Sequence, residues 1–220
     1  MQDEEHSSIY IYGIVDGRVN KMLNAECIGN SNQVYCVPFK DITAVVSNTP
    51  FIEYDPTEEN TLAHEKVIQV VLKENLTIAP MRFCTILKTR NDLIKLMHSA
   101  YLPFKRNILK IRNKLEFDVK VFLDVEKLMA EVNNDNELIE KSREIATELN
   151  NRLKQMAEDT VLEEQITEDM IMSASFLIHK EKIKGFYEEI KNFDEQFTDK
   201  LKIRISGPTA PYNFVDMPTR

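Results

Sequence analysis

His64 and Glu65 are adjacent in a stretch that the sequence predicts to be helical. A metalloprotease helix carries this pair followed by a second histidine four residues after the first. Here that position is occupied by Ile68. The zinc-protease motif is therefore absent, and we expect His64 to be solvated or to cap the helix.

Cys84 and Arg82 both lie in the apolar run Met81-Arg82-Phe83-Cys84-Thr85-Ile86-Leu87. Cys84 would be a nucleophile only if the fold placed it beside a base such as His64. A thiol in such a run is more often a small hydrophobic group, so we predict inert core packing for Cys84. Arg82 is either an edge residue or a buried cation paired with a carboxylate, for which Glu65 is the expected partner.

Other catalytic and metal-binding patterns are missing from the sequence. The five glycines are not clustered into a phosphate-binding loop, and the three cysteines show no CxxC spacing. The odd cysteine count also fits a reducing cytosol better than a disulfide framework. We therefore predict no enzyme activity, no metal and no cofactor. The alternative is a small-ligand or enzyme site formed by His64, Arg82 and Cys84.

The composition narrows the class of protein further. The chain has 220 residues, of which 43% are hydrophobic, and a formal net charge of −8. Such a chain can bury a core, but it has no basic block with which to bind nucleic acid or an anionic membrane. It shows neither a signal peptide nor a run of about 18 apolar residues. We expect a cytoplasmic globular protein without a small-molecule substrate.

Apolar periodicity predicts an α+β fold in two modules. We place their boundary near Phe117, which gives an N-terminal domain of residues 1–116 and a C-terminal domain of residues 117–220. Each module is predicted to be an antiparallel sheet with helices on one face. The first module is predicted to contain strands 9–15, 33–39, 42–47 and 78–87, a helix that opens at Asp55-Pro56, and a helix 89–115 that Pro103 bends. The second is predicted to contain strands 119–123, 170–179 and 201–206, a long charged helix 137–164 and a helix 181–197.

The closing segment, which we define as Ser206 to Val215, follows an alternating strand. It contains Gly207-Pro208 and then Pro211-Tyr212-Asn213-Phe214. Because proline fixes φ and removes a donor, this backbone is stiff and does not continue the strand ladder. We predict that Tyr212 and Phe214 pack back onto the protein. The alternative is that both rings are exposed anchors for a partner.

Several of these segments together resemble the gas vesicle protein F/L family. The resemblance covers the strand Ile9 to Val15, the helix His64-Glu65-Lys66-Val67, the strand Pro80-Met81-Arg82-Phe83, the strand Ala174 to Ile178, and Gly207-Pro208 with Pro211 to Val215. The chain departs from the family pattern in having Cys84 where a glycine is usual, Ser173 and Ser175 for asparagine and alanine, and Thr209 and Ala210 for tryptophan and proline.

The resemblance implies an accessory protein of gas vesicles with no known reaction and no cofactor. It implies a ferredoxin-like N-terminal domain and a C-terminal α+β domain with a long, coiled-coil-like helical extension. Its partners would be the small hydrophobic shell protein and other accessory proteins, during assembly of the vesicle. The motif residues that could contact a partner are His64, Glu65, Pro80, Arg82, Phe83, Gly207, Pro208, Pro211, Tyr212 and Phe214.

Overall fold

The structure, a computed structural model, describes residues 8–29, 33–130, 132, 134–164, 167, 169–197 and 200–218. The chain forms two compact units. The first unit combines residues up to Arg112 with residues from Ala210 onward, and the second unit is Asn113–Thr209. The expected boundary at 116/117 is thus displaced, because strand β7 (Lys114–Leu123) already belongs to the second sheet. The closing segment is also divided, since its residues from Ala210 onward belong to the first unit.

The first unit is built on an antiparallel sheet with the strand order β2-β3-β4-β1-β5, and β6 also pairs with β1. Its central strand β1 (Ser8–Asp16) has the alternating Ile and Tyr residues that predicted a strand. The other strands are β2 (Met22–Leu23), β3 (Val34–Phe39), β4 (Ile42–Thr49), β5 (Ile78–Pro80) and β6 (Ile86–Leu87).

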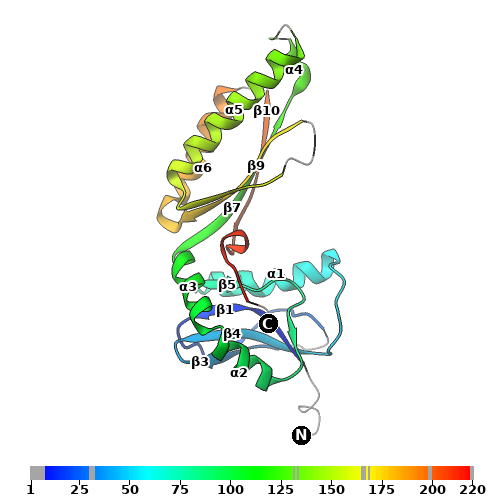
Figure 1. Cartoon of the computed structure of the whole chain (residues 1–220), viewed down its shortest axis with the longest axis vertical. Helices are drawn as coiled ribbons and strands as arrows, with labels where there is room; N and C mark the ends of the chain where they lie inside the picture. The colour runs from blue at the N-terminus through cyan, green and yellow to red at the C-terminus, as the bar shows by residue number, and fades with distance from the viewer. Residues whose placement is uncertain are drawn as a thin grey trace. The chain divides into compact units, whose positions relative to one another are not determined.

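Three helices cover this sheet: α1 (Glu58–Lys73), α2 (Arg90–Ser99) and α3 (Tyr101–Ile111) (Figure 1). All three contact β1. Every residue of β1 from Ser8 to Val15 is buried, so the strand is covered on both faces of the sheet. The cluster that contains Tyr10 and Tyr12 includes buried residues of α1 but none of α2 or α3. The expectation of helices on one face is therefore wrong for this unit, because a strand buried on both sides needs cover on both faces of its sheet.

Pro103 interrupts the helix predicted over 89–115 rather than bending it. Helix α2 begins after its N-cap Thr89 and ends at Ser99, and α3 begins at Tyr101. A proline cannot donate to the carbonyl four residues earlier, and its ring clashes with that carbonyl. For Pro103 that carbonyl belongs to Ser99, so the break at Ala100 leaves the ring in the first turn of α3, where it is tolerated.

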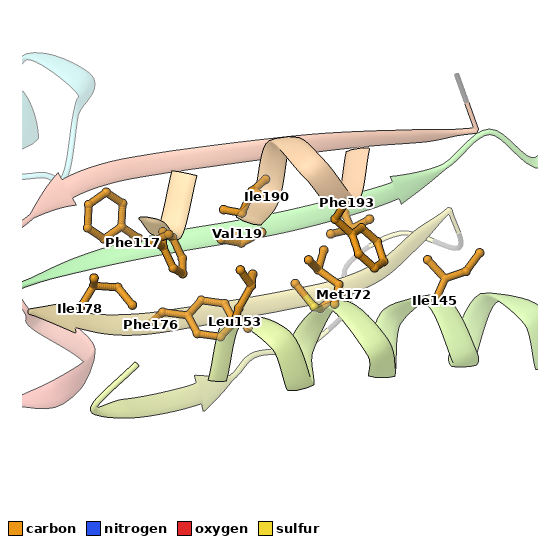
Figure 2. Packing of buried hydrophobic residues seen from close by; sticks show 13 residues of the cluster. Phe117, Val119, Ile145, Leu153, Met172, Phe176, Ile178, Ile190 and Phe193 are labelled. Carbon is orange, nitrogen blue, oxygen red and sulfur yellow. The ribbon is translucent and has the colours of Figure 1, made fainter. Parts of the chain in front are cut away.

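The second unit has a four-stranded antiparallel sheet with the order β10-β7-β9-β8. Its helices α5 and α6 lie over one face and enclose a core in which β7 and β9 contribute alternate residues (Figure 2). The elements after β7 are α4 (Val125–Met129), α5 (Asp135–Met156), β8 (Asp159–Leu162), β9 (Met170–His179), the 3₁₀ turn η2 (Lys180–Lys182), α6 (Ile183–Gln196) and β10 (Leu201–Thr209).

The long helix predicted over 137–164 is shorter than expected, and it is not an extended arm. Helix α5 ends at Met156, and the following residues form β8, which pairs with β9. Ile145, Leu149 and Leu153 of α5 are buried in the core of the unit. The apolar residues of this helix therefore pack against the sheet and do not form a coiled coil.

Candidate functional site

Helix α1 presents His64 to the central strand of the first unit. Its N-cap is Thr57 and not the predicted Asp55, and the Thr57 hydroxyl accepts a hydrogen bond from the Asn60 backbone N–H at 3.2 Å. His64 lies on the stripe that buries Val67, Ile68 and Val71. Only 4% of its surface is exposed, so the expectation of a solvated or capping histidine is wrong.

A chain of hydrogen bonds connects His64 with β1 and with the backbone at Cys84. The Cys84 N–H donates to the Tyr10 hydroxyl at 2.9 Å, and the Tyr10 oxygen lies 2.9 Å from His64 Nδ1. We assign Tyr10 as the donor to Nδ1, because the opposite assignment would leave the Tyr10 hydrogen without an acceptor among the described residues. The neutral ring then carries its hydrogen on Nε2. That atom is buried and has no hydrogen-bond partner among the described residues.

Burial lowers the pKa of His64 from 6.5 to about 4, and the nearby Met81 backbone opposes part of this shift. Between pH 6.5 and 4 the unfolded chain therefore binds a proton on His64 that the folded chain excludes. We expect the free energy of unfolding to fall by up to about 3 kcal/mol as the pH is lowered through this window, and to be unaffected by His64 above it. Urea unfolding of wild type and His64→Gln at several pH values measures the difference.

His98 provides the matched control for this experiment, because it is exposed on α2. His64→Gln should lose the His64 component of the pH dependence, and His98→Gln controls for replacing a histidine at an exposed position. Parallel pH curves for wild type and His64→Gln would show that His64 has an ordinary pKa.

The predicted strand 78–87 is interrupted by a short excursion that we call the Arg82 loop, residues 82–84. Before it, the Met81 N–H donates to the Tyr12 carbonyl at 2.8 Å. After it, the Ile11 N–H donates to the Thr85 carbonyl at 2.9 Å. Ile11 and Tyr12 are consecutive in β1, and they bond to the residues that flank the loop on either side. The three residues of the loop itself leave the sheet, and Pro80 ends β5, the strand before the loop.

This loop gives Arg82 and Cys84 surroundings that differ from those predicted. The Arg82 side chain is exposed and forms no ion pair with any residue that the structure describes, so the predicted buried pair with Glu65 is wrong. Cys84 lies in a turn and not in strand core, and its Sγ accepts a hydrogen bond from the Tyr54 N–H at 3.2 Å. The two predictions fail for one reason, which is that both residues lie in the excursion and not in the sheet.

Cys84 has φ of 62°, in the left-handed region that favours glycine. Cys84→Gly removes the strain that Cys84→Ala retains, while both variants lose the Sγ acceptor. We expect the glycine variant to be more stable than the alanine variant by about 1 kcal/mol in chemical denaturation.

A helical position supplies the control for Cys84. Ala63→Gly in α1 should be destabilising by about 1 kcal/mol, because glycine is unfavourable within a helix. If Cys84→Ala were at least as stable as Cys84→Gly, the left-handed conformation would not be a source of strain.

Five of the motif residues come together on the surface of the first unit. His64, Glu65, Arg82, Phe83 and Tyr212 line a hollow of about 490 Å³, together with Thr61 and Leu62. We call it the His64 hollow. Cys84 does not line it, so only two of the three residues proposed for a small-ligand or enzyme site are brought together. Of the remaining motif residues, Pro80 ends β5, Pro211 and Phe214 belong to the first unit, and Gly207 and Pro208 lie in β10 of the second unit.

Glu65 holds the closing segment at the edge of the His64 hollow. Its Oε2 accepts from the Tyr212 hydroxyl at 3.3 Å, and its Oε1 accepts from Gln69 Nε2 at 2.8 Å. Figure 1 shows the 3₁₀ turn η3 (Tyr212–Phe214) in red, and within it Phe214 is only 3% exposed. The prediction that these aromatic rings pack back onto the protein is thus confirmed for Phe214, and Tyr212 is half-buried.

Helix α3 contacts Phe214 of this segment and also Asp216, which follows the segment. Asn107 Nδ2 donates to the Asp216 carbonyl at 2.8 Å, and the Asp216 N–H donates to Asn107 Oδ1 at 3.1 Å. The Lys110 ammonium lies 5.8 Å from the centre of the Phe214 ring. Contacts with both α1 and α3 therefore make the residues after Thr209 an integral part of the first unit.

Sequence reasoning missed the tyrosines of β1. Tyr10 and Tyr12 are fully buried, and the Tyr12 hydroxyl accepts from the Ile28 N–H at 3.0 Å and lies 3.0 Å from Ser47 Oγ. The available signal was the alternation Ile-Tyr-Ile-Tyr, in which both hydroxyls point to one face and must find buried partners.

Two further results bear on the class of protein. Among the described residues, no three His, Cys, Asp or Glu side chains are grouped so that they could hold a metal ion. Within the same part of the chain, no helix has both the length and the apolar character needed to cross a membrane.

The chain belongs to the GvpL/GvpF family of gas vesicle synthesis proteins, whose family model matches residues 8–144 and 134–216. This membership gives it an accessory role in gas vesicles. Gas vesicle protein F1 of Halobacterium salinarum is 27% identical over 212 residues, which cover 96% of this chain and 93% of that protein. Gas vesicle protein F of Nostoc is 25% identical, covering 96% of this chain and 99% of that protein.

Solved structures agree with this assignment at the level of the fold. The crystal structure of the gas vesicle protein GvpF from Anabaena matches with a TM-score of 0.86 and 24% identity, and covers 96% of this chain and 97% of that one. GvpF from Microcystis aeruginosa matches with a TM-score of 0.80 and 23% identity, and covers 95% of this chain and 99% of that one.

Proposed function

We propose that this protein acts in gas vesicle assembly by binding the hydrophobic shell protein and other accessory proteins, and that it keeps shell protein from aggregating before assembly. The observation that carries the proposal is the family match along nearly the whole chain. A physical reason supports it: a shell subunit with an apolar gas-facing side exposes a patch that associates indiscriminately until a partner covers it.

The surface of the first unit offers support of its own. Leu62, beside the His64 hollow, is 50% exposed, and further large apolar side chains of this unit are at least as exposed: Phe51, Ile52, Leu102 and Leu109. A partner with an apolar surface would remove these side chains from water on binding.

The remaining parts of this proposal rest on the family and on the composition and motifs of the chain. The protein would reside with gas vesicles, need no cofactor, catalyse no reaction, and bind neither nucleic acid nor membrane. We also propose the ferredoxin-like description for the N-terminal module. The first unit departs from the standard order of that fold, because β1 continues to β3 without a helix in the described residues between them.

Deletion of the gene should reduce or abolish gas vesicles, because an assembly factor of this kind is needed before the shell can grow. Electron microscopy and flotation of a clean deletion strain measure vesicle number and shape, and complementation with the intact gene is the control. Vesicles of normal yield and shape in the deletion strain would exclude an essential role.

Binding is tested directly by capturing the purified protein with immobilised shell protein, with serum albumin as the control for non-specific apolar binding. Saturable capture by shell protein alone supports the proposal. If shell protein is not captured while a small metabolite raises the melting temperature, the alternative of a small-ligand protein with a site at His64 and Arg82 is favoured.

A further inference from the structure

The His64 hollow combines apolar walls with an available positive charge. Leu62, Phe83 and Tyr212 supply aliphatic and aromatic surface to its lining. Arg82 also lines it, is exposed, and has no ion-pair partner among the described residues. A guanidinium in this setting is free to pair with a carboxylate that arrives from outside.

The other charged group of the hollow is already engaged. Glu65 accepts one hydrogen bond on each carboxylate oxygen, from Gln69 and from Tyr212. It forms no ion pair with Arg82, and its hydrogen bond with the Tyr212 hydroxyl helps to fix the direction of that side chain. The hollow thus has aromatic rings along one wall, and its cation Arg82 has no ion-pair partner in the part of the chain that the structure describes.

The openness of the hollow favours a side chain of a polypeptide over a free small molecule. Small-molecule pockets enclose most of their ligand. Here Leu62, which lines the hollow, keeps half of its surface in solvent. A volume of about 490 Å³ is large enough for one large apolar side chain.

We propose that the His64 hollow binds a bulky apolar side chain of a partner polypeptide, and that a neighbouring aspartate or glutamate of the same partner pairs with Arg82. This assigns a surface and a recognition pattern to the proposed binding function, on which it rests. The apolar side chain provides most of the affinity through burial, and the ion pair selects partners with an acidic neighbour.

The experiment that tests this proposal uses the full chain and two short probes, the dipeptides Phe-Glu and Phe-Lys. Both dipeptides are acetylated at the N-terminus and amidated at the C-terminus. Binding is followed by NMR shifts of the aromatic resonances of Phe83 and Tyr212. We expect Phe-Glu to shift both rings, and Phe-Lys to bind about tenfold more weakly.

Two substitutions at exposed positions test the two parts of the pattern. Leu62→Lys places a charged chain beside the hollow and should weaken Phe-Glu binding by about tenfold or more. Arg82→Glu should weaken Phe-Glu and strengthen Phe-Lys, so that the preference between the probes reverses. The matched controls are Leu109→Lys, an exposed leucine of α3, and Arg90→Glu, an exposed arginine of α2, and both should bind as wild type does.

The outcomes separate this inference from the proposed function. If shell protein is captured by wild type and equally by Leu62→Lys and Arg82→Glu, the hollow is not the binding surface, although the proposed function stands. If Phe-Glu binds with the expected preference but shell protein is not captured, the hollow is a polypeptide site and the proposed partner is wrong. If neither dipeptide shifts Phe83 or Tyr212, the inference is overturned.

Discussion

Ending the chain at Thr209 should lower the free energy of unfolding of the first unit by about 4–6 kcal/mol. This figure is the burial of roughly 150–250 Å² of a single aromatic side chain at roughly 25 cal/mol per Å². Phe214 is 3% exposed and Ala210 is fully buried, so their removal opens the core of the unit. The same truncation removes the Asp216 contacts with Asn107. Calorimetry of the truncated and intact chains measures the loss.

A milder change separates packing from hydrogen bonding in this segment. Tyr212→Phe keeps the ring and removes the hydroxyl that bonds to Glu65, so it should cost about 1 kcal/mol or less. An unchanged melting temperature after truncation, together with loss of shell-protein capture, would mean that the segment docks partners and does not stabilise the fold.

Gly207→Ala should destabilise the second unit by about 2–5 kcal/mol, because it combines backbone strain with a steric clash. Gly207 has φ of 119°. A Cβ at this position would lie 2.7 Å from the Glu116 carbonyl oxygen and 3.2 Å from the Phe117 ring. Neither a backbone carbonyl of β7 nor a buried ring can move away at low cost.

Gly17 is the control position, because a substitution there tests the backbone strain without the steric clash. It also has positive φ, at 84°, but a Cβ added there would meet nothing within 4 Å. Gly17→Ala should therefore cost only about 1–2 kcal/mol, the price of the left-handed backbone. Denaturant titration measures the free energy of unfolding of both variants. If Gly207→Ala and Gly17→Ala lowered it equally, the clash with β7 would add nothing to the backbone strain.

Strong apolar periodicity made most elements of the fold predictable from the sequence. Strands β1 and β9 and helix α6 have the residue spacing of their type, and their ends lie close to those predicted. Strand β8 was missed because it has only four residues and follows a long helical pattern. Its stability comes from pairing with β9, which is a tertiary effect that local pattern does not contain.

The candidate site was predictable in its members but not in its arrangement. His64, Arg82 and Tyr212 were selected by resemblance, yet they lie on three segments that are far apart in the chain. Whether Arg82 points into the core or into solvent depends on the three-residue excursion opposite β1, and such a bulge leaves no periodic signal. The burial of His64 likewise depends on Tyr10, a partner supplied by another element.

The division of the first unit between two stretches of chain has a consequence for biosynthesis. Residues 8–112 leave the ribosome well before Ala210 and Phe214, while all of residues 113–209 are translated in between. Domains generally fold in the order in which they are translated. Here the first unit begins before the second unit but is completed after it. During translation, the surfaces of α1 and α3 that contact the residues from Ala210 onward therefore stay exposed until those residues are made. A nascent chain stalled before Ala210 would therefore be a target for chaperones at those surfaces.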